Sequence, residues 1–167
     1  MDLIKLKIPA AFILSRVHMS WREVQFGLAN ELLDHQALVD FAVEVLTRVE
    51  QPPSALIDLA SSSRIDPVRD LVDQLSAGEV ERTEADVRDK WLYVVLAWLY
   101  EQQGAMPDPL QAVEEVYADF GYPEEVAGFV RYMPMDGPDL GSREANERRL
   151  IERWKQYLDS TAVKLQQ

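Results

Sequence analysis

Apolar residues recur along most of the chain at the spacing of amphipathic helices. Between Asp34 and Glu50, one helical face carries Leu38, Phe41, Ala42, Val45, Leu46 and Val49. The segment 91–100, WLYVVLAWLY, is apolar around most of its circumference. Because a helix of that kind needs cover on all sides, this segment is expected to be the central helix on which the others pack.

Helix start and stop signals divide the chain into segments. Ser20 and Glu23 form a capping box, and Asp34 and Ser142 are further N-cap candidates. Asp66 and Asp108 each precede a proline as N-cap before N1, and Gly121 is a stop signal. The predicted helices come in pairs, which are 20–31 with 34–50, 54–62 with 67–77, 83–103 with 108–120, and 123–132 with 142–165. The only strand candidate is LIKLKI at residues 3–8, which has no visible partner strand.

The sequence therefore predicts an all-α fold. We expect an irregular bundle of about seven to eight helices in antiparallel pairs. An α-solenoid of the HEAT type is the alternative, although the pairs share no sequence period. The length of 167 residues predicts a single domain over residues 1–167.

The charge balance limits the partners that the chain can bind. The chain has 29 acidic and 17 basic residues, a formal net charge of −12. This excess argues against binding of nucleic acid, whose affinity comes largely from Lys and Arg, and against an anionic membrane surface. The partner expected from charge is a basic protein. The longest apolar run is about half the length of a bilayer span, so a soluble cytoplasmic protein is predicted.

Few residues offer catalytic chemistry. There is no Cys, and His18 and His35 each stand alone. No nucleophile elbow or phosphate-binding loop is present, so the chain is expected to be no enzyme, with no catalytic residue, no metal ligand and no cofactor. The alternative is a Mg²⁺-dependent all-α phosphohydrolase that uses the carboxylate pairs Asp70 and Asp73, Glu81 and Glu84, and Asp86 and Asp89.

The candidate binding site lies in an acidic stretch. Between Lys90 and Arg131 there are seven carboxylates and no basic residue. Helix N-termini account for some of these acids, whereas Glu114, Glu115 and Asp119 have no such explanation. A second acid-rich run, residues 23–63, holds seven acids against Arg48 alone.

Four aromatic residues surround the tight corner in the acidic stretch. They are Phe120, Tyr122, Phe129 and Tyr132. Rings at such a corner are more often core residues, whereas tyrosines flanked by carboxylates also suit a binding hot spot. The predicted partner-binding residues are Glu114, Glu115, Asp119, Tyr122, Glu124 and Glu125.

Two stretches carry a family resemblance. HMSWREVQFGL at residues 18–28 and DPLQAVEEVYADFGYPEEVAGFVRYMP at residues 108–134 resemble a bacterial family classified as domain of unknown function 2247, over roughly residues 12–160. The resemblance implies no activity and no catalytic residues. By analogy with other small acidic proteins, the function expected is non-enzymatic binding, in its most concrete form an immunity protein that neutralises a basic toxin. A helical-repeat adaptor that binds a peptide is a further alternative.

Overall fold

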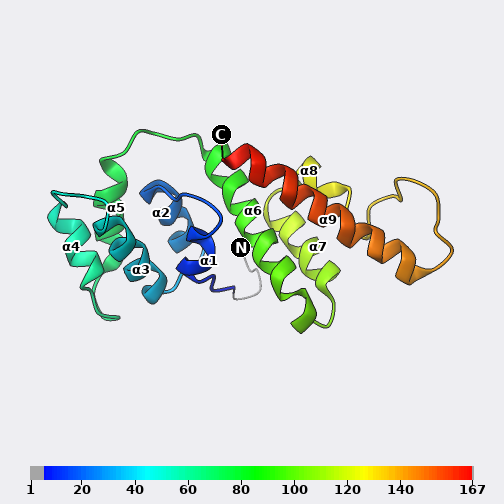
Figure 1. Cartoon of the computed structure of the whole chain (residues 1–167), viewed down its shortest axis with the longest axis horizontal. Coiled ribbons are helices and arrows are strands. Elements are labelled where there is room, and N and C mark those ends of the chain that lie inside the picture. Colours follow the sequence, from blue (N-terminus) through cyan, green and yellow to red (C-terminus); the bar gives the residue numbers. More distant parts are fainter. Residues whose placement is uncertain (1–5, 167) are drawn as a thin grey trace. The chain divides into compact units, whose positions relative to one another are not determined.

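All regular structure in residues 6–166, which the computed structural model describes, is helical (Figure 1). The elements are α1 (Ala10–Leu14), α2 (Trp21–Ala29), α3 (His35–Leu46), α4 (Ser54–Ala60), α5 (Val68–Ala77), α6 (Glu84–Gln102), the 3₁₀ turn η1 (Gln103–Ala105), α7 (Pro109–Asp119), α8 (Glu124–Ala127) and α9 (Arg143–Leu165). The prediction of an all-α fold is confirmed. Within the described range α1 is the one helix that the apolar pattern did not predict.

The described residues pack as two compact units. Residues 6–91 form one unit and residues 92–166 form the other, here called the N-terminal unit and the C-terminal unit. Helix α6 begins in the first unit and ends in the second. The single domain expected from chain length stays a prediction.

Helices of the N-terminal unit contact one another in succession and across the unit. Helix α3 contacts α4, α4 contacts α5, and α2 contacts α5. The predicted pairing of α4 with α5 is therefore present, whereas α3 lies against α4 as well. The solenoid alternative stays a prediction.

The middle of helix α6 is buried around its whole circumference. The seven consecutive residues from Trp91 to Ala97 are all buried. Since seven residues make nearly two helical turns, no face of this segment meets solvent. The burial expected for this apolar segment is therefore present over residues 91–97, whereas its role as the central helix on which the others pack stays a prediction.

In the core of the C-terminal unit, aromatic rings pack on Trp154 of α9, which is fully buried. The ring of Phe129 stacks on Trp154 at 6.4 Å between centroids, and Tyr100 meets it edge-on at 5.2 Å. Helix α8 contacts α9 and is shorter than predicted, because it ends at the C-cap Gly128.

Most of the predicted caps are present. Ser20, Asp34, Asp108 and Ser142 each accept a hydrogen bond from the backbone N–H three residues on. Asp66 was predicted to cap α5, but the N-cap is Pro67, and the Asp66 carboxylate instead accepts from Ser63. Part of the strand candidate 3–8 lies outside the described residues, and residues 6–8 form no strand.

Candidate partner-binding site

The candidate site is built on the C-terminal end of α7. The helix ends in a Schellman motif, in which Tyr122 N donates to Tyr117 O at 2.8 Å and Gly121 N donates to Ala118 O at 3.1 Å. Gly121 has φ 77°, the left-handed conformation that this motif requires. Tyr122 follows with φ 61°, which is uncommon for a residue with a side chain and adds strain of roughly 1 kcal/mol. The backbone therefore holds Tyr122 in one defined place.

The four aromatic residues of the corner divide into core and surface. Phe120 and Phe129 are buried, whereas Tyr122 and Tyr132 are 62% and 57% exposed. Both exposed rings pack on the buried Tyr117, with centroid distances of 5.3 and 6.1 Å. The structure thus presents two rigid aromatic side chains to solvent on a buried third ring.

Arg131 lies at the centre of an ion-pair network that the sequence pattern did not reveal. Its Nη1 and Nη2 donate to the two carboxylate oxygens of Asp108 at 3.1 and 3.0 Å. Its Nε donates to Glu114 at 3.1 Å, and Nη1 lies 3.4 Å from Glu147. The hydrogen bond from Arg131 lowers the pKa of Asp108, and the same bond raises the pKa of Arg131.

The network changes the interpretation of the acidic stretch. Glu114 was predicted to face a partner, but its carboxylate is half-buried and turned to Arg131. Arg131 is the first basic residue after the acidic stretch, so its position was the available signal for this role. No local pattern, by contrast, separates the exposed Tyr132 from the buried Phe129.

Replacing Arg131 by Gln is expected to lower the free energy of unfolding by about 1–2 kcal/mol at pH 7. The loss is modest because 38% of the Asp108 side chain is exposed. A carboxyl with a lowered folded pKa contributes stability that is present above its unfolded pKa and is lost as pH falls through the folded value. The difference between the two proteins should therefore shrink below about pH 4.

Urea unfolding at pH 7 and near pH 3 measures this difference. The matched control is Arg48→Gln, because Arg48 pairs with Glu44 on the exposed surface of α3 and its C-terminal turn. This control should lose no more than about 0.5 kcal/mol at either pH. A loss for Arg131→Gln that is the same at both pH values would contradict the role given to Asp108.

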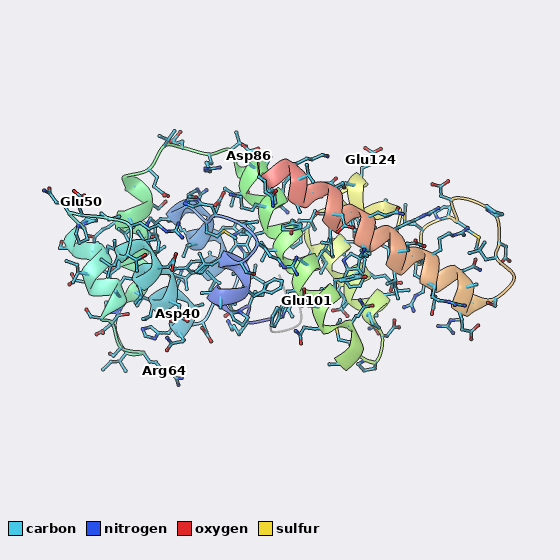
Figure 2. All side chains as sticks on the ribbon, in the orientation of Figure 1. Asp40, Glu50, Arg64, Asp86, Glu101 and Glu124 are labelled. Carbon is cyan, nitrogen blue, oxygen red and sulfur yellow. The ribbon has the colours of Figure 1, made fainter. Side chains whose placement is uncertain are left out.

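The other predicted acids keep their charge free of a basic partner in the described part of the chain. Asp119 and Glu115 are half-buried, and Glu124 and Glu125 are exposed. Figure 2 shows Glu124 extending outward from α8. Glu115 and Asp119 are four apart on α7 and so share one helical face. These four carboxylates flank Tyr122 in the sequence on both sides.

The carboxylate pairs of the magnesium alternative make other contacts. Asp73 accepts from Gln25 at 2.6 Å, and Asp86 accepts from the Thr83 hydroxyl at 2.6 Å in the cap of α6. Within residues 6–166, no three His, Asp or Glu side chains lie close enough together to hold a metal ion. The phosphohydrolase alternative stays a prediction. The contacts of Asp73 and Asp86 are ordinary hydrogen bonds within the fold and do not favour a metal site.

The stretch 18–28 has structural roles in the N-terminal unit. Glu23 Oε2 accepts from Ser20 N at 2.8 Å to complete the capping box of α2. The Glu79 carboxylate accepts from Trp21 N and Arg22 N at 3.0 and 2.9 Å. The N-terminus of α2 is thus satisfied by two carboxylates, one of which comes from a distant segment.

Glu23 also makes a buried ion pair. The residue is 0% exposed, and its Oε1 lies 2.8 Å from Lys90 Nζ and 3.7 Å from Arg82 Nη1. The Trp91 indole donates to Glu23 O at 2.7 Å, and the ring covers Gly27. These contacts connect α2 to α6 within the N-terminal unit.

No helix in residues 6–166 has the length and apolar character needed to cross a membrane. The longest apolar run, residues 91–100, lies in α6, where its first seven residues are buried in the protein. Burial in the protein interior accounts for this apolar run.

A protein-family model described as "Uncharacterized protein conserved in bacteria (DUF2247)" matches residues 10–162. This range contains both stretches on which the resemblance rests, residues 18–28 and 108–134. No curated protein and no solved structure matches the chain. The predicted family is confirmed, and the chain belongs to this bacterial family.

Proposed function

We propose that this chain is a non-enzymatic binding protein that holds a basic protein partner on its acidic tyrosine surface. This surface consists of Tyr122, Tyr132, Glu115, Asp119, Glu124 and Glu125. The observation that carries the proposal is the pair of exposed tyrosines packed on the buried Tyr117. Rigid aromatic rings bury area at low entropic cost, which is typical of binding hot spots.

The charge of the partner follows from the surrounding carboxylates. Arg131 forms ion pairs with Asp108 and Glu114, whereas Glu124 and Glu125 have no basic partner in the described range. Unpaired carboxylates around an aromatic centre favour a partner that brings Lys or Arg, and they speed its association. Nucleic acid and anionic membranes are repelled by the same charge.

In its most concrete form, the partner is a toxin and the chain is a cytoplasmic immunity protein. A toxin that acts on nucleic acid needs a basic cleft, which an acidic surface with protruding rings could occlude. This form predicts that co-expression of the chain protects cells against the partner.

The test begins with affinity capture from a lysate of the encoding bacterium at low and then moderate salt. A retained basic protein, identified by mass spectrometry, is then purified for binding kinetics. Tyr122→Ala is expected to weaken its affinity about 10- to 100-fold, mainly through faster dissociation. Reversal of Glu124 and Glu125 to Lys is expected to slow association about tenfold at low salt and to flatten its salt dependence.

The matched control reverses Glu144 and Glu152, two exposed acids of α9, and changes the net charge equally. This control should change association much less than the reversal at Glu124 and Glu125. Equal effects of the two reversals would show that overall charge, and no particular surface, governs association. An acidic partner, or one whose affinity survives Tyr122→Ala, would contradict the proposed surface.

A further inference from the structure

A pocket of about 860 Å³ lies between α9 and the loop that joins α8 to α9. Figure 1 shows this loop extending past the N-terminal end of α9. All residues that line the pocket belong to the C-terminal unit, from Ala127 to Arg153. Its volume falls in the range of small-molecule sites, roughly 300–1,000 Å³.

Four arginines line this pocket in a protein whose net charge is −12. Arg131 is paired with three carboxylates, and Arg143 donates to Glu147 at 3.1 Å. The charges of these two arginines are therefore compensated. Arg149 and Arg153 differ from them in their partners.

Arg149 and Arg153 bind only neutral groups. Arg149 Nη1 donates to Pro138 O at 2.8 Å. Arg153 donates to Gly128 O at 3.2 Å and to Asp136 O at 2.6 Å. A carbonyl oxygen accepts a hydrogen bond but leaves the charge of the guanidinium uncompensated. In residues 6–166 neither side chain has a carboxylate within ion-pair distance.

The two guanidinium groups are neighbours. They are four residues apart on α9, and both lie within 4 Å of the position that a Cβ on Gly137 would take, Arg149 Nη1 at 3.3 Å and Arg153 Nη2 at 3.8 Å. The Nε of Arg149 is buried and has no acceptor. Two adjacent like charges favour the binding of an anion.

The nearby acids of the lining form no ion pair with Arg149 or Arg153. The pKa of Asp139 is lowered mainly by its hydrogen bond from Asn146, and the charge of Arg149 is the smallest of the influences that lower it. Asp139 directs one carboxylate oxygen to Asn146 Nδ2 and Gly141 N, at 3.0 and 2.9 Å. Asp136 contributes its backbone oxygen to Arg153, and its residue is exposed. Each acid is therefore outside ion-pair distance of Arg149 and Arg153.

The lining also contains apolar side chains, and two glycines determine the course of the loop. Met133, Met135 and Leu150 contribute apolar side chains, and Met135 is 53% exposed. Gly137 and Gly141 have φ 113° and 91°, which only glycine adopts readily, so the loop depends on these residues for its course. Methionine side chains adapt to ligands of varied shape.

We propose that this pocket binds a small organic anion. Its carboxylate or phosphate lies at the guanidinium groups of Arg149 and Arg153, and its apolar body lies on Met133, Met135 and Leu150. This site shares no residue with the acidic tyrosine surface and takes a ligand of opposite charge. The two proposals can therefore fail independently.

Calorimetric titration of the full chain with octanoate, octyl phosphate and inorganic phosphate tests the site. We expect one-to-one binding of at least one octyl compound, with inorganic phosphate at least about tenfold weaker because it lacks the apolar body. The tighter of the two octyl compounds identifies the anionic group. Absence of binding by both octyl compounds at millimolar concentration, or equal affinity for inorganic phosphate, would overturn the proposal.

Variants of α9 locate the binding. Arg149→Gln and Arg153→Gln should each weaken binding of the octyl compound about tenfold. The matched control is Arg148→Gln, because Arg148 is exposed on the same helix and does not line the pocket. It should leave the affinity unchanged, and equal weakening in all three variants would contradict the site.

Loss of the Arg149 contact to Pro138 could also loosen the loop, so a second variant separates charge from loop structure. Arg149→Lys keeps the charge but loses the planar fork that reaches the carbonyl. If the charge holds the ligand, Arg149→Lys retains more affinity than Arg149→Gln. If both substitutions weaken binding equally, the anion is not held by the charge of Arg149 and the proposal is wrong.

Discussion

Replacing Lys90 by Met is expected to lower the free energy of unfolding by about 3–5 kcal/mol. Lys90 Nζ lies 2.8 Å from Glu23 Oε1, and the Glu23 side chain is only 1% exposed. Without Lys90 the carboxylate would remain buried, with Arg82 at 3.7 Å as its nearest cation. The substitution also removes the hydrogen bond from Lys90 to His18 O. Urea unfolding at pH 7 measures the loss.

The matched control is Lys155→Met, in which the same substitution breaks an exposed pair. Lys155 and Asp159 have side chains that are 60% and 70% exposed, so this control should lose no more than about 0.5 kcal/mol. Adding Glu23→Gln to Lys90→Met should recover part of the stability, because no unpaired charge is then buried. Similar losses in the two Met variants would show that Lys90 is not needed to compensate Glu23.

The second large effect is expected for Gly27→Ala in α2. A Cβ at this position would lie 2.3 Å from Trp91 Cζ2, 2.7 Å from Trp91 Cη2 and 2.9 Å from Leu33 Cδ1. The indole cannot move aside easily, since Trp91 is fully buried and donates to Glu23 O. Overpacking costs about 1–3 kcal/mol and sometimes more, whereas Ala in place of Gly gains about 1 kcal/mol in a helix. With contacts this short, the net loss expected is about 2 kcal/mol.

Urea unfolding measures whether Gly27→Ala lowers the free energy of unfolding. The control is Gly104→Ala, where a Cβ would meet nothing within 4 Å. That control should change stability by less than about 0.5 kcal/mol. Trp91→Phe removes ring atoms that obstruct the Cβ, so Gly27→Ala should destabilise less in that background than in the natural sequence. A stabilised Gly27→Ala protein would mean that the core around Trp91 yields without strain.

Both large effects involve residues of the stretch 18–28, Glu23 and Gly27, so we expect this stretch to have a structural role in this chain. Ser20 and Glu23 begin α2, and Gly27 receives the ring of Trp91. The stretch 108–134 combines structure with the proposed binding function. Its Asp108 and Arg131 form the ion pair, whereas Tyr122 and Tyr132 face solvent.

The helices from α2 to α9, and most of their ends, follow from the amino-acid sequence, whereas α1 does not. Capping acts over three residues, so Ser20, Asp34, Asp108 and Ser142 could be assigned without knowledge of the fold. The Schellman turn at Gly121 is local for the same reason. The predicted end of the segment 34–50 was too late, because the apolar pattern reaches Val49 although α3 ends at Leu46. Val49 is exposed, which a pattern of residue types cannot foresee.

Tertiary structure alone decided which charges are compensated and which rings are exposed. Glu23 forms an ion pair with Lys90, which is far from it in the sequence. Arg131, which follows α8, forms an ion pair with Asp108, the N-cap of α7. Neither pairing leaves a local trace, because charged side chains select partners by distance in space. Tyr132 and Phe129 have similar neighbours in the sequence, and only packing against Trp154 buries the second. The pocket at Arg149 and Arg153 likewise exists only because the loop folds back onto α9.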